Sequence, residues 1–194
     1  MSAVLEVAAA AAALVADEGL DYAAAKKKAA RALGHRGELP SHEQLEDAVF
    51  EHLAIFHADT QPAELRALRE LALQWMRRLE AFRPHLSGAV WRGTATRQSA
   101  VQIDLYCDDP KAAEIELRNR GLDFDTASQD RPGRDPLQVL SLAARVPGWH
   151  EPATLHLLVR DRDELRGALQ PDARGRSWRG DVTALARRLE EDPT

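Results

Sequence analysis

The sequence predicts an α+β protein in which a helical N-terminal half packs with a mixed α/β half. Two observations carry this prediction. Apolar residues recur at helical spacing throughout residues 1–83, with no alternating run. From residue 84 onward the period changes, and strand-like stretches alternate with short helical ones between turns that contain Gly and Pro. A chain of 194 residues is long enough for one ordinary domain or two small ones.

Four helices are predicted in the first half, and their ends carry recognisable signals. Gly19 and Gly34 each follow a helical stretch, where glycine favours termination. Ser41 stands three residues before Gln44, which is the spacing of a capping box. Pro84 follows a Leu-rich stretch with a broad apolar face and ends it. The predicted helices cover, in order, about residues 3–17, 20–34, 41–59 and 62–82.

The second half is predicted to hold the whole sheet, between residues 86 and 160. The predicted strands are "LSGAVWRGT" (86–94), "AVQIDLYCDD" (100–109), "LDFDTA" (122–127), "PLQVLSLAARV" (136–146) and "ATLHLLVRD" (153–161). The predicted helices are residues 109–121, 162–169 and 181–192. Because the junction at 83–88 is short, the helical region 1–83 and the α/β region 84–194 are expected to form one compact unit.

Composition excludes several classes of protein. The net charge of −5 argues against a surface that binds nucleic acid everywhere. Cys107 is the only cysteine, so no internal disulfide and no cysteine zinc cluster can form, and we expect a reducing cytoplasmic setting. The Ala-rich N-terminus contains Glu6 and is too short to span a membrane, and no membrane partner is expected. His52 and His57 are five residues apart, which misses the spacing of a helical zinc pair.

One stretch, "LSGAVWRGTATRQSAVQIDLYCDD" at residues 86–109, has the residue types that nucleotide chemistry needs. Gly93-Thr94 suits a tight turn whose backbone amides approach a triphosphate. Asp104 lies ten residues later within a predicted strand, and a carboxylate there suits Mg²⁺, which prefers oxygen ligands.

On these residues the chain resembles the DNA-polymerase-beta-like nucleotidyltransferase superfamily. In that family a Gly-Ser or Gly-Gly pair ends an apolar strand, and an Asp-x-Asp or Asp-x-Glu strand follows. The resemblance implies that Asp104 is catalytic and binds Mg²⁺, with Asp109, Asp123 and Asp125 as further metal ligands. It implies a nucleoside triphosphate as partner and a protein or RNA as acceptor. The residues that would hold the nucleotide are Arg92, Gly93, Thr94, Arg97, Arg176 and Arg179. The stretch "GLDYAAAKKKAARALG" also resembles the front of a group of bacterial proteins, a likeness that brings no function with it.

One departure from the family pattern leaves alternatives open. Gln102 stands where the first acid of the pair belongs, and its amide offers no charge to a metal. The chain is therefore a nucleotidyltransferase, or a catalytically degenerate member of that fold that acts as a binding or regulatory module. A helical interaction protein with an unrelated α/β half is the third alternative.

The two faces of the predicted strand at 100–107 distinguish a nucleotide cleft from a solvent-facing surface at Asp104. Alternation puts Gln102 and Asp104 on the same, more polar face, directed either into a nucleotide cleft or toward solvent. In a cleft with other acids, Asp104→Asn is expected to abolish Mg²⁺-dependent nucleotide binding and to leave stability unchanged or slightly raised. On a solvent-facing surface it is expected to change neither.

Overall fold

A computed structural model of the chain describes residues 2–192. Its contacts divide the chain into two units. The helical unit comprises the residues up to Leu65 together with Gly93–Ser99, and the sheet unit comprises Arg66–Arg92 together with the residues from Ala100 onward. This division differs from the one at residues 83 and 84 that the sequence suggests, and a single compact body stays a prediction. None of the helices in the described part of the chain is both long and apolar enough to cross a membrane.

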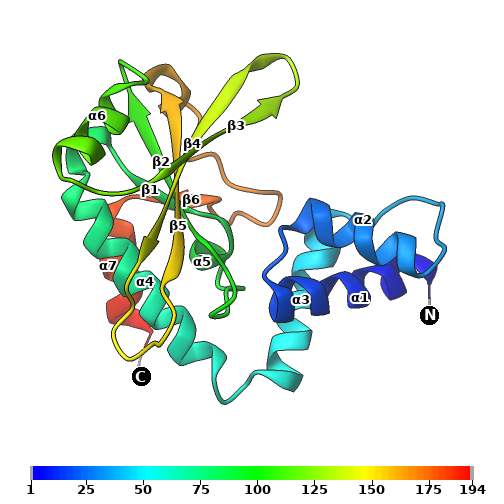
Figure 1. The fold of residues 1–194 in the computed structure, drawn as a ribbon. Coiled ribbons are helices and arrows are strands. Elements are labelled where there is room, and N and C mark those ends of the chain that lie inside the picture. The colour runs from blue at the N-terminus through cyan, green and yellow to red at the C-terminus, as the bar shows by residue number, and fades with distance from the viewer. Residues whose placement is uncertain (1, 193–194) are drawn as a thin grey trace. The chain divides into compact units, whose positions relative to one another are not determined.

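The helical unit is built from short-chain apolar residues. Its helices are α1 (Ala3–Glu18), α2 (Tyr22–Ala32), α3 (His42–Phe56) and the first turn of α4 (Gln61–Arg78). Helix α1 packs against both α2 and α3 (Figure 1). More than half of the residues in the buried cluster between these helices are alanines. The buried cluster consists of Val7, Ala11, Ala12, Val15, Ala16, Ala25, Ala29, Ala30, Leu45, Val49 and Leu53.

The predicted capping box and the termination at Gly19 are confirmed, while α3 ends at Phe56, before the predicted residue 59. The Asp21 side chain accepts from the backbone N–H of Ala24. Ser41 and Gln44 form the reciprocal capping box, which satisfies two N–H groups that the first turn of α3 leaves unpaired. Gly19 ends α1 in the left-handed region, at φ 70°. A Cβ on Gly19 would also collide with the carbonyl of Gln98, so both the conformation and the close approach require glycine.

The sheet unit contains one mixed sheet of six strands. The strand order is β3-β4-β5-β2-β1-β6, and β2 and β5 are parallel while the other neighbours are antiparallel. The strands are β1 (His85–Ser87), β2 (Val101–Cys107), β3 (Asp125–Arg131), β4 (Arg134–Ala144), β5 (Ala153–Asp161) and β6 (Arg179–Gly180). The helices besides α4 are α5 (Gly88–Arg92), α6 (Ala112–Asn119) and α7 (Val182–Glu191), with 3₁₀ turns η1 (Glu80–Phe82) and η2 (Arg162–Leu165).

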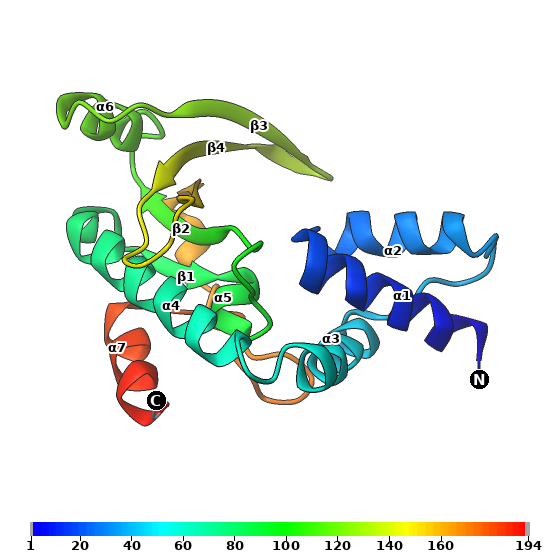
Figure 2. The same ribbon diagram turned by 60° about the horizontal axis from the view of Figure 1, so that its bottom comes forward.

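Helices α4 and α7 lie side by side on the same side of this sheet (Figures 1 and 2). The Arg66 guanidinium of α4 donates to the carbonyl of Leu189 in α7 at 3.1 Å. Arg69, almost fully buried, donates to the carbonyls of Val90 and Trp91 at 3.0 and 3.2 Å. Guanidinium groups thus satisfy carbonyls at the end of the short helix α5.

The predicted α+β class, with helices first and the sheet second, is confirmed, and three element predictions are corrected. Only Leu86 and Ser87 of the stretch 86–94 belong to a strand, β1, because Gly88 takes φ 69° and the chain then turns into α5. The sheet begins at residue 85 and extends to β6, beyond the predicted limit of residue 160. The predicted helix at 162–169 is only the 3₁₀ turn η2, and Gly167 follows with φ 84°.

Candidate functional site

Asp104 lies in the middle of β2 and is fully buried. Strand β2 has buried residues on both faces, so the solvent-facing alternative for Asp104 does not apply. The residues directly paired with it are His85 on β1 and Leu158 on β5. Paired residues on neighbouring strands present their side chains to the same face. Neither neighbour therefore supplies a second carboxylate beside Asp104.

Arginines surround the Asp104 carboxylate instead. Arg160 Nε donates to Asp104 Oδ1 at 2.5 Å, and Arg179 Nη1 lies 3.6 Å from Asp104 Oδ2. Arg179 also donates to the Tyr106 hydroxyl at 2.7 Å. Burial of the Tyr106 ring, and next the nearby Asp104 charge, raise the pKa of that phenol. Arg160 also reaches Glu164 Oε2 at 3.4 Å, so a second acid joins the network.

Gln102 belongs to a row of polar residues that crosses the sheet on the face of Asp104. The register aligns Gln102 with His156 on β5, Ser141 on β4 and Asp125 on β3. Ser141 Oγ and His156 Nδ1 are 2.7 Å apart, and burial lowers the pKa of that imidazole. Strands are spaced about 4.8 Å apart, so Asp125 lies roughly 14 Å from β2. That separation is too large for one metal ion to bridge Asp125 and Asp104.

The remaining predicted metal ligands lie on the surface. Asp109 and Asp123 are exposed, and Asp109 Oδ1 accepts from the backbone N–H of Lys111. Within residues 2–192, only one set of three or more His, Cys, Asp or Glu residues brings its ligand atoms within 4.8 Å of one another, and it contains none of these acids. The structure therefore does not bring Asp104, Asp109, Asp123 and Asp125 together, and this set does not fit Mg²⁺, which needs several oxygen ligands around one point.

The predicted phosphate turn at Gly93-Thr94 is part of the helical unit. Gln61 donates to the carbonyls of Gly93 and Ala95 at 3.1 and 2.9 Å, and the Thr94 side chain is fully buried. Thr96 Oγ1 donates to the carbonyl of Ala16. The segment Gly93–Ser99 is thus held by hydrogen bonds to helices. Its exposed Arg97 pairs with Glu64 at 3.0 Å.

The glycine that lies against Gln102 is Gly88, which the sequence reasoning missed. It follows β1 directly, and a Cβ placed on it would lie 2.8 Å from Gln102 Oε1. Its φ of 69° also requires glycine. The signal in the sequence is its place directly after Leu86-Ser87, five residues before Gly93.

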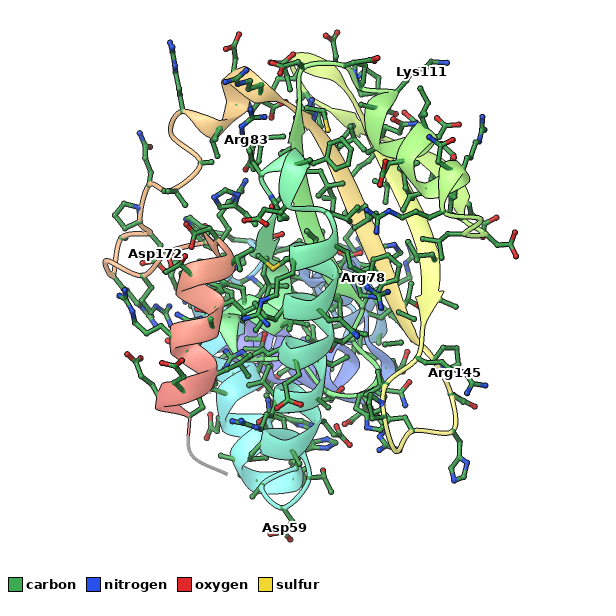
Figure 3. The ribbon with its side chains drawn as sticks, turned by 90° about the vertical axis from the view of Figure 1, so that its left-hand side faces the viewer. Asp59, Arg78, Arg83, Lys111, Arg145 and Asp172 are labelled. Atoms are coloured by element: carbon green, nitrogen blue, oxygen red, sulfur yellow. The ribbon has the colours of Figure 1, made fainter. Side chains whose placement is uncertain are left out.

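Two of the predicted nucleotide-binding arginines, Arg92 and Arg176, pair with Asp172 in the loop before β6. Arg92 Nη2 donates to Asp172 Oδ2 at 2.8 Å, and Arg176 Nε lies 3.5 Å from the same oxygen. Asp172, labelled in Figure 3, belongs to the loop that leads to β6 and α7. The Arg92 hydrogen bond, together with backbone N–H groups of the loop, lowers the Asp172 pKa to about 2. The Arg92 guanidinium also lies 4.5 Å from the Trp178 ring centroid, a cation–π contact.

An open pocket of about 1020 Å³ lies where the parallel strands β2 and β5 end. Cys107 and Asp161, the last residues of these strands, both line it. Ligands commonly bind at the carboxyl ends of parallel strands. The pocket is rich in guanidinium groups, which suit phosphate through their planar, forked geometry. Its arginines are Arg131, Arg134, Arg160, Arg166 and Arg179, and its acids are Asp135, Asp161, Asp163 and Glu164.

No family model matches the sequence, and no curated protein is similar to it. Similar solved structures include Cid1 poly(U) polymerase with MgGTP bound, at 16% identity over 63% of this chain with a TM-score of 0.35. Cid1 with the UTP analogue UMPNPP is 14% identical over 63% of this chain, with a TM-score of 0.35. A cytoplasmic RNA terminal U-transferase is 15% identical over 66% of this chain, with a TM-score of 0.36. The chain spans 38–40% of each of these three chains. Identities and TM-scores this low carry no functional conclusion.

Proposed function

We propose that this protein is a catalytically degenerate nucleotidyltransferase-like module that binds a nucleoside triphosphate in the arginine-rich pocket and does not transfer a nucleotidyl group. One observation carries the proposal. Arg160 and Arg179 line the pocket and also contact the Asp104 carboxylate, so cations stand where metal-dependent transfer needs acids.

The binding part of the proposal is supported by the pocket itself. Its volume of about 1020 Å³ is slightly above the roughly 300–1,000 Å³ typical of small-molecule sites. Arg134 is largely exposed and lies 3.6 Å from Glu164, and Arg166 is exposed. Exposed guanidinium groups that are not locked into buried pairs can turn toward phosphate oxygens at little energetic cost.

The degenerate part of the proposal is supported by the surroundings of Asp104. A divalent ion beside Asp104 would have to displace Arg160 from its 2.5 Å contact and would meet a second guanidinium at 3.6 Å. Gln102 adds no charge on that face. The residues around Asp104 therefore do not fit Mg²⁺. The protein or RNA acceptor that an active transferase would use has no role in this proposal.

The test measures binding of ATP, GTP, CTP and UTP by calorimetry, once with Mg²⁺ and once with EDTA. We expect at least one triphosphate to bind at millimolar concentration or below, with similar affinity in both buffers, because arginines rather than a metal contact the phosphates. Arg166→Ala and Arg134→Ala should each weaken binding by about 1.5–3 kcal/mol, the range for a hydrogen bond to a charged group.

The matched control is Arg162→Ala, because Arg162 is exposed, lies outside the pocket and pairs with Asp108 at 3.2 Å. This variant should bind as the wild type does. Absence of binding by all four triphosphates would contradict the binding part of the proposal. Binding that requires Mg²⁺, accompanied by release of pyrophosphate with an RNA or protein acceptor, would contradict the degenerate part and favour an active nucleotidyltransferase.

A further inference from the structure

The helical unit brings two histidines and an aspartate together at one point. His57 Nε2 lies 2.7 Å from Asp17 Oδ1, and His52 Nε2 lies 3.4 Å from the same oxygen. The three ligand atoms all lie within 4.8 Å of one another, and they form the only such group within residues 2–192. These residues take no part in the pocket of the sheet unit.

The local backbone explains how a five-residue spacing produces this cluster. Helix α3 ends at Phe56, and His57 leaves the helix with φ −129° and ψ 15°. Its side chain is therefore freed from the rotation of 100° per residue that separates helical positions. His52 remains within α3, and the two imidazole rings lie 5.7 Å apart between centroids. The expectation that this spacing cannot form a metal pair assumed that both residues are helical.

Of the two separations from Asp17 Oδ1, one matches a tetrahedral metal site and the other is shorter. Zn–N and Zn–O bonds of about 2.0–2.2 Å place neighbouring ligand atoms roughly 3.3 Å apart. The His52 distance of 3.4 Å agrees with this value, and the His57 distance of 2.7 Å would have to widen by about 0.6 Å. The Asp17 side chain is 48% exposed, so it can make this shift without disturbing the core.

The electrostatic setting also favours a cation. Asp17 lies in the last turn of α1, which ends at Glu18, and His57 caps the end of α3. Carbonyl groups at the C-terminal end of a helix carry partial negative charge, so two such ends act together at this point. Neither helix has a Lys or Arg in its last turn to neutralise that charge.

We infer that Asp17, His52 and His57 form a binding site for a divalent transition-metal ion of the Zn²⁺ class. Two imidazole nitrogens and one carboxylate oxygen are a ligand set that Zn²⁺ accepts, and three protein ligands leave a fourth position for water. Asp17 is half exposed while His52 and His57 are only 15% and 24% exposed, so the ion can enter from solvent and is held against the helices.

The full chain is first purified in the presence of a chelator and then titrated with Zn²⁺ in a calorimeter. Visible absorption spectroscopy of the protein with Co²⁺ reports the coordination geometry. We expect one Zn²⁺ per chain and the intense d–d bands of tetrahedral Co²⁺. His52→Gln, His57→Gln and Asp17→Asn should each weaken Zn²⁺ binding at least tenfold, since even the loss of a residue that only supports a ligand costs about 10- to 100-fold.

His150→Ala is the matched control, because His150 is an exposed histidine in the turn between β4 and β5 of the other unit. It should bind Zn²⁺ as the wild type does. Asp17→Asn preserves the shape of a half-exposed side chain, so this variant is expected to fold. It keeps the test valid if circular dichroism shows that a histidine variant is unfolded. Absence of Zn²⁺ binding by the wild type, or equal affinity in Asp17→Asn and wild type, would overturn the inference.

Discussion

Removal of the buried charge at Asp104 is expected to destabilise the sheet unit. In Asp104→Asn the Arg160 guanidinium loses the carboxylate that it contacts at 2.5 Å. The sequence alone predicted unchanged or slightly raised stability for a cleft in which other acids lie beside Asp104. The charged groups that contact Asp104 are arginines, so the expected sign reverses.

The size of the effect follows from the geometry. Two unit charges about 4 Å apart attract by about 4 kcal/mol at an effective dielectric constant of 20. Removal of one partner of a buried pair typically costs about 3–5 kcal/mol. Arg160 is 17% exposed and keeps a contact with Glu164 at 3.4 Å, which offsets part of the loss. We therefore expect Asp104→Asn to cost about 3 kcal/mol and to lower Tm by about 6–12 °C.

Urea denaturation followed by circular dichroism and by tryptophan fluorescence measures this cost. Asp125→Asn is the control, because Asp125 is an exposed carboxylate on the same sheet, and it should stay within about 0.5 kcal/mol of wild type. A double-mutant cycle with Arg160→Gln should give a coupling free energy of at least about 1 kcal/mol. An Asp104→Asn protein as stable as wild type would refute the ion-pair reasoning.

Three further predictions concern other residues of the sheet unit. Burial raises the pKa of the Cys107 thiol to about 11, so at pH 8 a disulfide reagent should leave it unmodified in the native protein and modify it in urea. Arg92 lowers the Asp172 pKa to about 2, so the stability from this pair is present above the ordinary aspartate pKa near 3.9 and is lost as pH falls toward 2. Urea midpoints measured from pH 5 to 2 should therefore fall less in Asp172→Asn than in wild type, and parallel curves would contradict this. Gly180→Ala should cost about 1–3 kcal/mol in urea denaturation, because its Cβ would overlap the buried Trp91 ring, and a neutral effect would show that the ring can move.

Local sequence signals determined the helical half of this protein. The capping box of Ser41 and Gln44 and the termination at Gly19 depend on hydrogen bonds and backbone angles that span only a few residues. Strand β5 was predicted at its observed bounds, because an apolar run stands between two clear turns. These features form by near-neighbour rules, so a single sequence is enough to predict them.

The candidate site was decided by tertiary structure. The partner of Asp104 is Arg160, which lies 56 residues away and reaches it only because β2 and β5 pair in parallel. The approach of His57 to Asp17 likewise depends on the end of α3 at Phe56, one residue before His57, and on the packing of α1 against α3. Whether a carboxylate meets a cation, another acid or water depends on which strands and helices become neighbours. That choice minimises the free energy of the whole fold, and no short stretch such as the one around Asp104 contains it.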